Sequence, residues 1–357
     1  MERFGEIENK TFAHLHGNIY FCKSSRFKRL EDMNIGIAVN YFKRIYSEVT
    51  ELSRQTGYNR FYHLWDYLTA FVRHGAHIDQ YIAGGFWSYS NPQRSKCLTH
   101  YRRLALEKKY NNPADVHYFK NKPEFNRFFS DFVHRGWLWI REATFDDFKA
   151  FLERYRTVIV KPMDGKQGDG IRKLDFVDDE AELHRVFDAL VKENVIVEEL
   201  IVQHPEMVFG NKSVNTIRVL TACRPDGKAR IMKAFLRAGV GDTLVDNTAT
   251  GGYYYEVDLE HGIVSSEGIS KDGTRVFIHP QTDIVMLGFK VPLWDQVVKM
   301  CVDAAGRLPR VALVGWDVAI SQDHVQLIEG NNSADYIGYE FVGSNGYYEK
   351  IKAFMEP

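Results

Sequence analysis

The chain has 357 residues, of which 45% are hydrophobic and 26% are charged, and its formal net charge is −1. This composition is ordinary for a globular protein, and the length allows two domains or one large core with an attached lobe. The balanced charge provides no bulk attraction to nucleic acid or to an acidic membrane, so we expect neither as a partner.

The cysteines and the start of the chain favour a cytoplasmic protein. The four cysteines are far apart and form no CxxC pair; they are Cys22, Cys97, Cys223 and Cys301. We interpret them as reduced thiols rather than as a disulfide framework or a zinc site. The first ten residues contain no apolar signal core, and no uncharged apolar run is long enough to span a bilayer. We therefore expect a cytoplasmic location and no membrane span.

Residues 1–113 are predicted to form a mainly helical region. Apolar and aromatic residues recur at three- and four-residue spacings over 35–52 and 61–82, which is typical of helices. Gly84-Gly85 then breaks the pattern, and Tyr89–Pro92 indicates a turn.

The basic stretch 94–109 predicts another helix, whose charges either face solvent or meet an anionic substrate; we favour a solvated face. Asn111-Asn112-Pro113 marks a lobe boundary. Beyond it, Pro123 suits the first turn of a helix beginning near Lys120. Thr144-Phe-Asp-Asp147 is typical of a capping box that begins a helix running to Tyr155.

A β-branched strand, Thr157–Val160, leads to Lys161 and then to a loop containing Gly165, Gly168 and Gly170. Glycine lets the backbone approach an anion closely, and a lysine at a strand end offers a point charge to phosphate. The stretch is not a P-loop, because no Gly-Lys-Ser/Thr follows and the loop leads into a strand. A plain hairpin turn would explain the glycines but not a lysine in so apolar a strand, so the stretch predicts phosphate binding.

A helix predicted over 178–194 precedes the apolar strand 195–202, which contains Glu198 and Glu199. The backbone of such a strand can hydrogen-bond an adenine edge, and a glutamate can hold ribose hydroxyls. On these residues alone, two exposed glutamates at a strand end are the favoured alternative.

The segment Ser213–Ala222 alternates as a strand and places Thr216 and Arg218 on one face. A guanidinium group at that position suits a phosphate or a carboxylate. Arg224–Gly227 predicts a hairpin turn, and the returning strand carries Lys233 and Arg237. The polar loop 246–252 then leads into a strand at Tyr253–Tyr255; either of these loops alone is also consistent with a plain connection.

The most informative stretch is 311–331, in which two apolar runs flank the polar break 321–324 and predict a β-hairpin. Glu329 and Asn331 are two residues apart and share one face of a strand. A hairpin centred on Asp323 brings Asp317 opposite Glu329. A strict two-residue turn would shift the register by one residue, so this interpretation requires a three-residue loop or a bulge.

Carboxylates inside an apolar hairpin are costly unless a positive charge neutralises them. Two carboxylates and an amide oxygen suit a hard cation such as Mg²⁺. The alternative is that Asp317 pairs with an arginine and that Glu329-Gly-Asn-Asn is a turn ending the strand.

The order of these features resembles the ATP-grasp superfamily, and within it the sugar-transfer-associated proteins related to glutamate ligases. The resemblance covers roughly residues 115 to 350 and implies an α+β fold in which two α+β subdomains clamp ATP. A lid subdomain would span about 114–200 and a catalytic subdomain about 201–357, after the mainly helical region 1–113. Many family members begin instead with a Rossmann-like domain, so the resemblance does not define the acceptor site.

The resemblance also implies roles for individual residues. Lys161 and Arg218 would be the catalytic residues, with Lys161 on the ATP phosphates and Arg218 facing the transferred phosphate. Lys122 would be the second ATP lysine, with Lys120 as the alternative. Asp317, Glu329 and Asn331 would hold Mg²⁺. The cofactor-binding set comprises Lys122, Lys161, Gly165, Gly168, Gly170, Glu198, Glu199, Ile201, Asn215 and Lys233.

The activity implied is that of an ATP- and Mg²⁺-dependent carboxylate–amine ligase, which forms an amide through an acylphosphate. The protein would position reactants and balance charge, so no serine or cysteine nucleophile is required. The implied substrates are an amino acid and a cell-surface-sugar precursor, as in polysaccharide biosynthesis. Two alternatives stay open: a kinase on the same scaffold, and a non-catalytic nucleotide-binding regulatory protein. The sequence does not define an oligomeric state.

Overall fold

The structure is a computed structural model, and it describes residues 20–23, 26–29, 35–82, 84–163, 168–242, 244, 246, 251–270, 274–333 and 346–356. The chain divides into two compact units, Met1–Thr69 and Ala70–Pro357. Among the helices in the described ranges, none has both the length and the apolar composition needed to cross a bilayer.

The first unit contains helical segments, as its sequence pattern predicts, and also a β-hairpin that the sequence analysis did not predict. The strands β1 (Tyr20–Lys23) and β2 (Arg26–Arg29) pair antiparallel. They are followed by α2 (Ile35–Thr56) and by α3 (Arg60–His74), which continues into the second unit. One face of α2 is buried, because its apolar residues recur every three or four positions.

The second unit begins with short helical segments. They are α4 (Ile78–Ile82), η2 (Phe86–Ser88), α5 (Asn91–Lys96), α6 (His100–Tyr110), α7 (His117–Lys120), α8 (Lys122–Phe128) and η3 (Ser130–Phe132). The helical pattern over 61–82 is interrupted at Gly75, whose φ of 66° lies in the left-handed region that ends helices. The predicted helix over 94–109 is likewise two helices, because Cys97 and Thr99 adopt extended backbone conformations.

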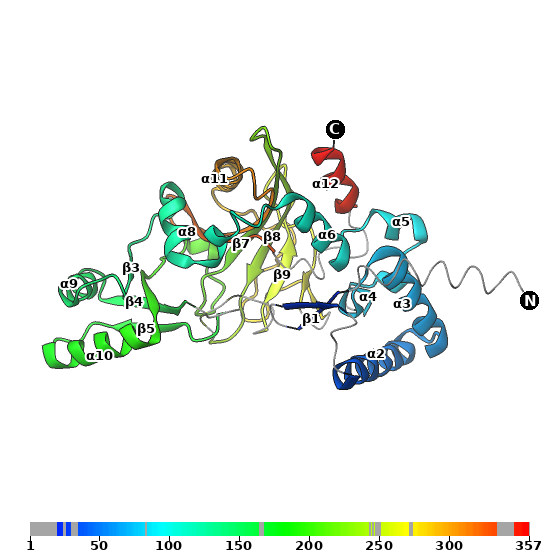
Figure 1. Ribbon diagram of the computed structural model, residues 1–357, viewed down its shortest axis with the longest axis horizontal. Helices are drawn as coiled ribbons and strands as arrows, with labels where there is room; N and C mark the ends of the chain where they lie inside the picture. Colours follow the sequence, from blue (N-terminus) through cyan, green and yellow to red (C-terminus); the bar gives the residue numbers. More distant parts are fainter. Residues whose placement is uncertain are drawn as a thin grey trace, which may run out of the picture. The chain divides into compact units, whose positions relative to one another are not determined.

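A four-stranded antiparallel sheet forms the smaller α+β part of this unit, with the strand order β3-β6-β4-β5. Its strands are β3 (Trp137–Trp139), β4 (Thr157–Pro162), β5 (Arg172–Asp175) and β6 (Val195–Glu199). Two helices, α9 (Phe145–Tyr155) and α10 (Glu180–Glu193), lie beside the sheet in Figure 1 and share an apolar core with it. The predicted capping box is confirmed: Thr144 and Asp147 exchange hydrogen bonds at the start of α9.

A seven-stranded antiparallel sheet forms the larger part, with the order β11-β10-β9-β8-β7-β12-β13. Its strands are β7 (Thr216–Cys223), β8 (Ala229–Ala238), β9 (Tyr253–Glu256), β10 (Gly268–Ile269), β11 (Arg275–Val276), β12 (Leu313–Ile320) and β13 (Val325–Asn331). The turn η4 (Pro205–Met207) precedes β7. The predicted turn at Arg224–Gly227 joins β7 to β8, and Gly227 there has a φ of 84°.

The two faces of the seven-stranded sheet differ. One face packs against α11 (Trp294–Arg307) in the main apolar core. The other face is apolar where α6 and α12 (Tyr347–Met355) contribute to a second core with Leu220 and Phe235. Because side chains alternate along a strand, Arg218 and Asp317 lie on this second face beyond its apolar part. The fold thus leaves a polar half-face on the larger sheet.

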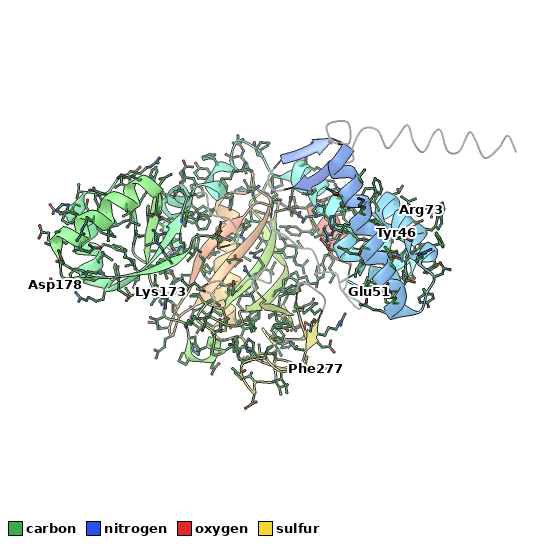
Figure 2. All side chains as sticks on the ribbon, turned by 90° about the horizontal axis from the view of Figure 1, so that it is seen from below. Tyr46, Glu51, Arg73, Lys173, Asp178 and Phe277 are labelled. Carbon is green, nitrogen blue, oxygen red and sulfur yellow. The ribbon has the colours of Figure 1, made fainter. Side chains whose placement is uncertain are left out.

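Figure 2 labels three residues at the surface of the two sheet-containing parts of this unit. Lys173 on β5 and Asp178 in the segment after β5 lie along the lower border of the smaller part, and Phe277 follows β11, the edge strand of the larger sheet. All three side chains are exposed. Two buried charged residues, Arg135 and Glu198, lie instead where the smaller sheet contacts the β12–β13 hairpin.

Candidate functional site

Asp317 and Glu329 lie opposite each other on β12 and β13, as the sequence predicted. Ser321 N–H donates to the His324 carbonyl at 2.9 Å, so the turn itself contains only two residues. A register shift between Asp317 and Val318 compensates, which is the bulge that the prediction required. Asn331 donates from Nδ2 to Glu329 Oε1 at 3.0 Å. The three predicted metal ligands therefore occupy one face of the hairpin.

Asp317 is the centre of a buried ion-pair cluster. Arg218, its register partner on β7, reaches both carboxylate oxygens, with Nη2 at 2.8 Å from Oδ2. Arg237 on β8 donates to Oδ2 at 2.9 Å and also contacts Asp246 Oδ1 at 2.8 Å. The arginine pairing that the sequence left open for Asp317 is present.

The pKa values of the two hairpin carboxyl groups shift in opposite directions. Burial alone would raise the pKa of Asp317, but Arg218 and Arg237 outweigh it and lower the pKa to about 2. The Glu329 side chain retains access to solvent, yet the protein packed around its carboxyl group, followed by the charge of Asp317, raises its pKa. The two carboxyl groups are close enough to share a hydrogen bond.

This donor set fits a hard cation. A cation beside Asp317 and Glu329 would relieve the repulsion that raises the pKa of Glu329, and Asn331 offers an amide oxygen nearby. Over the described ranges, no three His, Cys, Asp or Glu side chains form a ready-made metal centre. The predicted set is of another kind, since it has two carboxylates and an amide.

Lys161, at the end of β4, points to a buried carboxylate. Its Nζ contacts Glu198 Oε2, and the Glu198 side chain is only 3% exposed. Arg135 lies on the other side of Glu198, with Nη2 at 3.1 Å from Oε1 and Nε at 3.0 Å from Oε2. Burial would raise the pKa of Glu198, but Arg135 and Lys161 outweigh it and lower the pKa well below its usual range. Glu198 is therefore an anionic anchor for Lys161.

Lys122 reaches the same strand end as Lys161. Its Nζ donates to the carbonyl oxygens of Pro162 at 2.9 Å and Met163 at 3.2 Å. Lys122 is the first residue of α8, with Asn121 as the N-cap and Pro123 in the first turn, as the sequence favoured. Lys120, the alternative, is an exposed residue at the end of α7.

The glycine loop after β4 is described at Gly168 and Gly170, whereas Gly165 lies outside the described residues. Gly168 and Gly170 have φ values of 83° and 74°, and a Cβ atom at Gly170 would lie 2.7 Å from Pro162 Cγ. Both positions thus require glycine.

The sugar-transfer associated ATP-grasp family matches the chain over residues 101–356. The chain belongs to this family. The ATP-grasp fold, with two α+β subdomains after a helical N-terminal region, is therefore the fold of this protein. The enzymes with this fold are ligases.

Solved structures are similar at low identity. The ATP-grasp ligase PsnB, complexed with the precursor peptide PsnA2 and AMPPNP, is 16% identical with a TM-score of 0.42, covering 73% of this chain and 66% of PsnB. Biotin carboxylase from Campylobacter jejuni is 12% identical with a TM-score of 0.43, covering 66% of this chain and 46% of that one. D-alanyl-alanine synthetase A from Vibrio cholerae is 13% identical with a TM-score of 0.38, covering 69% and 63%. No curated protein matches the chain.

Within this ATP-grasp chain, two of the predicted adenosine residues lie at the end of β6. Glu199 N–H donates to the Gly136 carbonyl at 2.9 Å, and Gly136 N–H donates to Glu199 Oε2 at 2.8 Å. Ile201 follows the strand and is half-buried. Glu198 points toward Lys161 and Arg135 instead.

Asn215 and Lys233, which the sequence assigned to cofactor binding, each contact other groups of the protein. Asn215 is fully buried, donates to the Met207 carbonyl at 2.7 Å and accepts from Gly239 N–H at 2.9 Å. It holds neighbouring loops together. Lys233 is also buried, with Nζ at 3.5 Å from Glu256 Oε1 and at 4.2 Å from the ring centroid of Tyr347.

Three residues of the charged clusters were not among the predicted site residues. Arg237 shares the alternation of β8 with Lys233, which is a signal that could have included it. Asp246 precedes a polar glycine loop and contacts Arg237 and Thr216. Arg135 is a single arginine between η3 and β3, and no sequence pattern marks it.

Proposed function

We propose that this protein is an ATP- and Mg²⁺-dependent carboxylate–amine ligase that activates a carboxylate as an acylphosphate and transfers it to an amine. The row Arg218–Asp317–Glu329 across β7, β12 and β13 carries this proposal. A row of cationic and anionic groups on the polar half-face suits a nucleotide phosphate with its metal, and membership of the ATP-grasp family supports a ligase.

Lysine side chains of the smaller sheet and of α8 would bind the nucleotide phosphates. Lys161 and Lys122 converge on the end of β4, where the glycine loop begins. Gly165, Gly168 and Gly170 would allow the loop backbone to approach the phosphates. The end of β6, with Glu199 and Ile201, would hold the adenosine through backbone groups, while Glu198 keeps Lys161 in place.

Arg218 would orient the transferred phosphoryl group and the carboxylate that accepts it. Its guanidinium is fixed by Asp317, so it presents its charge without reorganising. Asp317, Glu329 and Asn331 would hold Mg²⁺, which when bound neutralises phosphate charge in the transfer. Arg237 and Asp246 would keep Asp317 and Arg218 in their relative positions.

The family description, sugar-transfer associated ATP-grasp, supports a substrate related to sugars. We propose that the enzyme joins an amino acid to a cell-surface-sugar precursor. A cytoplasmic location agrees with an enzyme that consumes ATP. Amide formation, magnesium dependence and a place in polysaccharide biosynthesis are parts of the same proposal.

The test is phosphate release from Mg-ATP in the presence of carboxylates and amines, including amino acids and uronic-acid sugars, with products identified by mass. We expect release only when both partners are present, together with a product of amide mass. Transfer of phosphate to one partner alone would overturn the ligase in favour of a kinase. Tight Mg-ATP binding without turnover would favour a regulatory protein.

A further inference from the structure

One buried guanidinium connects the two sheets of the second unit. Arg135 lies in the segment between η3 and β3 and is 5% exposed. Its Nη1 donates to the Leu327 carbonyl at 2.6 Å, and its Nη2 donates to the Ile328 carbonyl at 3.1 Å. Nη1 also lies 3.5 Å from Gln326 Oε1 on β13, and the guanidinium contacts Glu198 on β6 as described above. The same side chain therefore contacts the strand beside Lys161 and the strand that carries Glu329.

The two carbonyl groups that Arg135 contacts lie at the β-bulge of the hairpin. Leu327 pairs with Val318 and Glu329 pairs with Asp317, so Ile328 is the extra residue of the bulge. A bulge disrupts the regular ladder locally, and its buried carbonyl groups require donors from elsewhere. Arg135 supplies these donors one residue before Glu329. Its contacts therefore stabilise the register that brings Glu329 opposite Asp317.

On its other side, the Arg135 guanidinium contacts Glu198, which in turn holds Lys161 in place. Glu198 accepts from Arg135 and from Lys161, and Asn126 Nδ2 approaches its Oε1 at 3.3 Å. An arginine can serve both sides at once, because its planar fork presents five donors in a fixed geometry. A lysine at position 135 would retain the charge beside Glu198 but could not reproduce the fork.

We infer that Arg135 is a positioning residue that fixes Lys161 relative to the hairpin bearing Asp317 and Glu329. The inference rests on the proposed function for its catalytic meaning, since both groups are assigned there to the nucleotide and its metal. Arg135 itself touches none of the reacting atoms in this assignment. It acts through Glu198 on one side and through the bulge on the other.

The experiment compares Arg135→Lys and Arg135→Met in the full-length protein with the control Arg307→Lys. Arg307 also donates to a backbone carbonyl, that of Phe128, and pairs with Asp131, but it is far more exposed than Arg135 and contacts neither Glu198 nor the hairpin. We expect Arg135→Lys to fold and to bind ATP without metal within about threefold of the wild type. We expect its kcat for Mg-ATP turnover to fall about 100-fold, the size of effect that a 1 Å misplacement produces.

A merely structural arginine would lower the thermal stability and leave kcat and KM unchanged well below the melting temperature. Arg135→Lys with kcat/KM within threefold of the wild type would therefore overturn the inference. Arg307→Lys is expected to match the wild type in both parameters. Arg135→Met, which also loses the charge beside Glu198, is expected to lose stability as well as turnover.

Hydrogen exchange provides a measurement that does not depend on the proposed function. We expect Arg135→Lys to increase exchange in peptides covering 325–331 and 195–199 together, with no change over α11. Unchanged protection in both peptides would overturn the positioning role. A wild-type protein that neither binds nor turns over Mg-ATP would instead overturn the proposed function, and exchange would still decide whether Arg135 connects the two strands.

Discussion

Because of the ion-pair cluster around Asp317, we expect neutralising Asp317 and neutralising Glu329 to change the stability of the fold in opposite directions. Asp317→Asn removes the negative charge between Arg218 and Arg237, whose side chains are 11% and 13% exposed. Breaking a buried ion pair costs about 3–5 kcal/mol, and the asparagine oxygen still accepts one hydrogen bond, so we expect about 3 kcal/mol of destabilisation. Glu329→Gln removes a charge whose ionised form the fold already disfavours, as its raised pKa shows. We expect it to change stability by less than about 1 kcal/mol, in the stabilising direction.

Equilibrium urea unfolding followed by far-UV circular dichroism measures both effects. With a slope of about 3 kcal/mol per molar urea, Asp317→Asn lowers the midpoint by about 1 M, whereas Glu329→Gln leaves it unchanged or slightly higher. Both variants are expected to lose Mg-ATP turnover under the proposed function. Equal midpoints for the two variants, or a larger loss for Glu329→Gln, would refute the assignment of Asp317 as the anion that holds the two arginines.

Three further predictions concern the phosphate lysine, a loop amide and acid stability. Lys161→Ala is expected to weaken ATP binding at least tenfold, because a charge-assisted contact contributes about 1.5–3 kcal/mol, and calorimetry showing an unchanged Kd would count against the phosphate role. Asn215→Ala is expected to destabilise the fold by about 2 kcal/mol, because it leaves the Met207 carbonyl and Gly239 N–H without their partner. ATP affinity is expected to be preserved. Weaker ATP binding by the folded variant would show that Asn215 belongs to the nucleotide site. Folding lowers the pKa values of Glu198 and Asp317 below their ordinary values of 4.5 and 3.8, so the ionised carboxylates stabilise the fold at pH values above these. The urea midpoint should therefore fall as the pH decreases through and below 4.5 and 3.8. A constant midpoint from pH 6 to pH 3 would contradict this.

The hairpin shows what the sequence could predict about the site. Alternation along a strand has a period of two residues, so Glu329 and Asn331 had to share a face in any register. The carboxylates made an apolar hairpin costly unless they met positive charge, and this argument predicted either a metal or an arginine for Asp317. The structure contains the arginine pairing, in a register that needs the predicted bulge. Local periodicity and the cost of burying charge were sufficient here.

The network around Glu198 shows what the sequence could not predict. Glu198 contacts Asn126, Arg135 and Lys161, which lie 72, 63 and 37 positions away in the chain. No local pattern determines such pairings, because they depend on how β6 packs between β3 and β4 and against the hairpin. The same limit applies to Asn215, whose amide contacts the Met207 carbonyl and Gly239 N–H inside the fold. The helix interruption at Gly75 was missed for another reason: the apolar period over 61–82 continues across it. The interruption between Cys97 and Thr99 lies in a stretch that contains neither Gly nor Pro to mark it.

The charge balance on the polar half-face of the larger sheet supports the proposed chemistry. Arg218 and Arg237 carry two positive charges, whereas Asp246, Asp317 and Glu329 carry three negative charges when ionised. Burial raises the pKa of Asp246 and, together with the charge of Asp317, that of Glu329. Glu329 is the exposed member, so the uncompensated charge is at the surface of the hairpin. A divalent cation bound there would give the row a net positive charge, which is the sign that a nucleotide phosphate requires. Removing either arginine should therefore impair phosphate binding even though Asp317 separates both of them from Glu329.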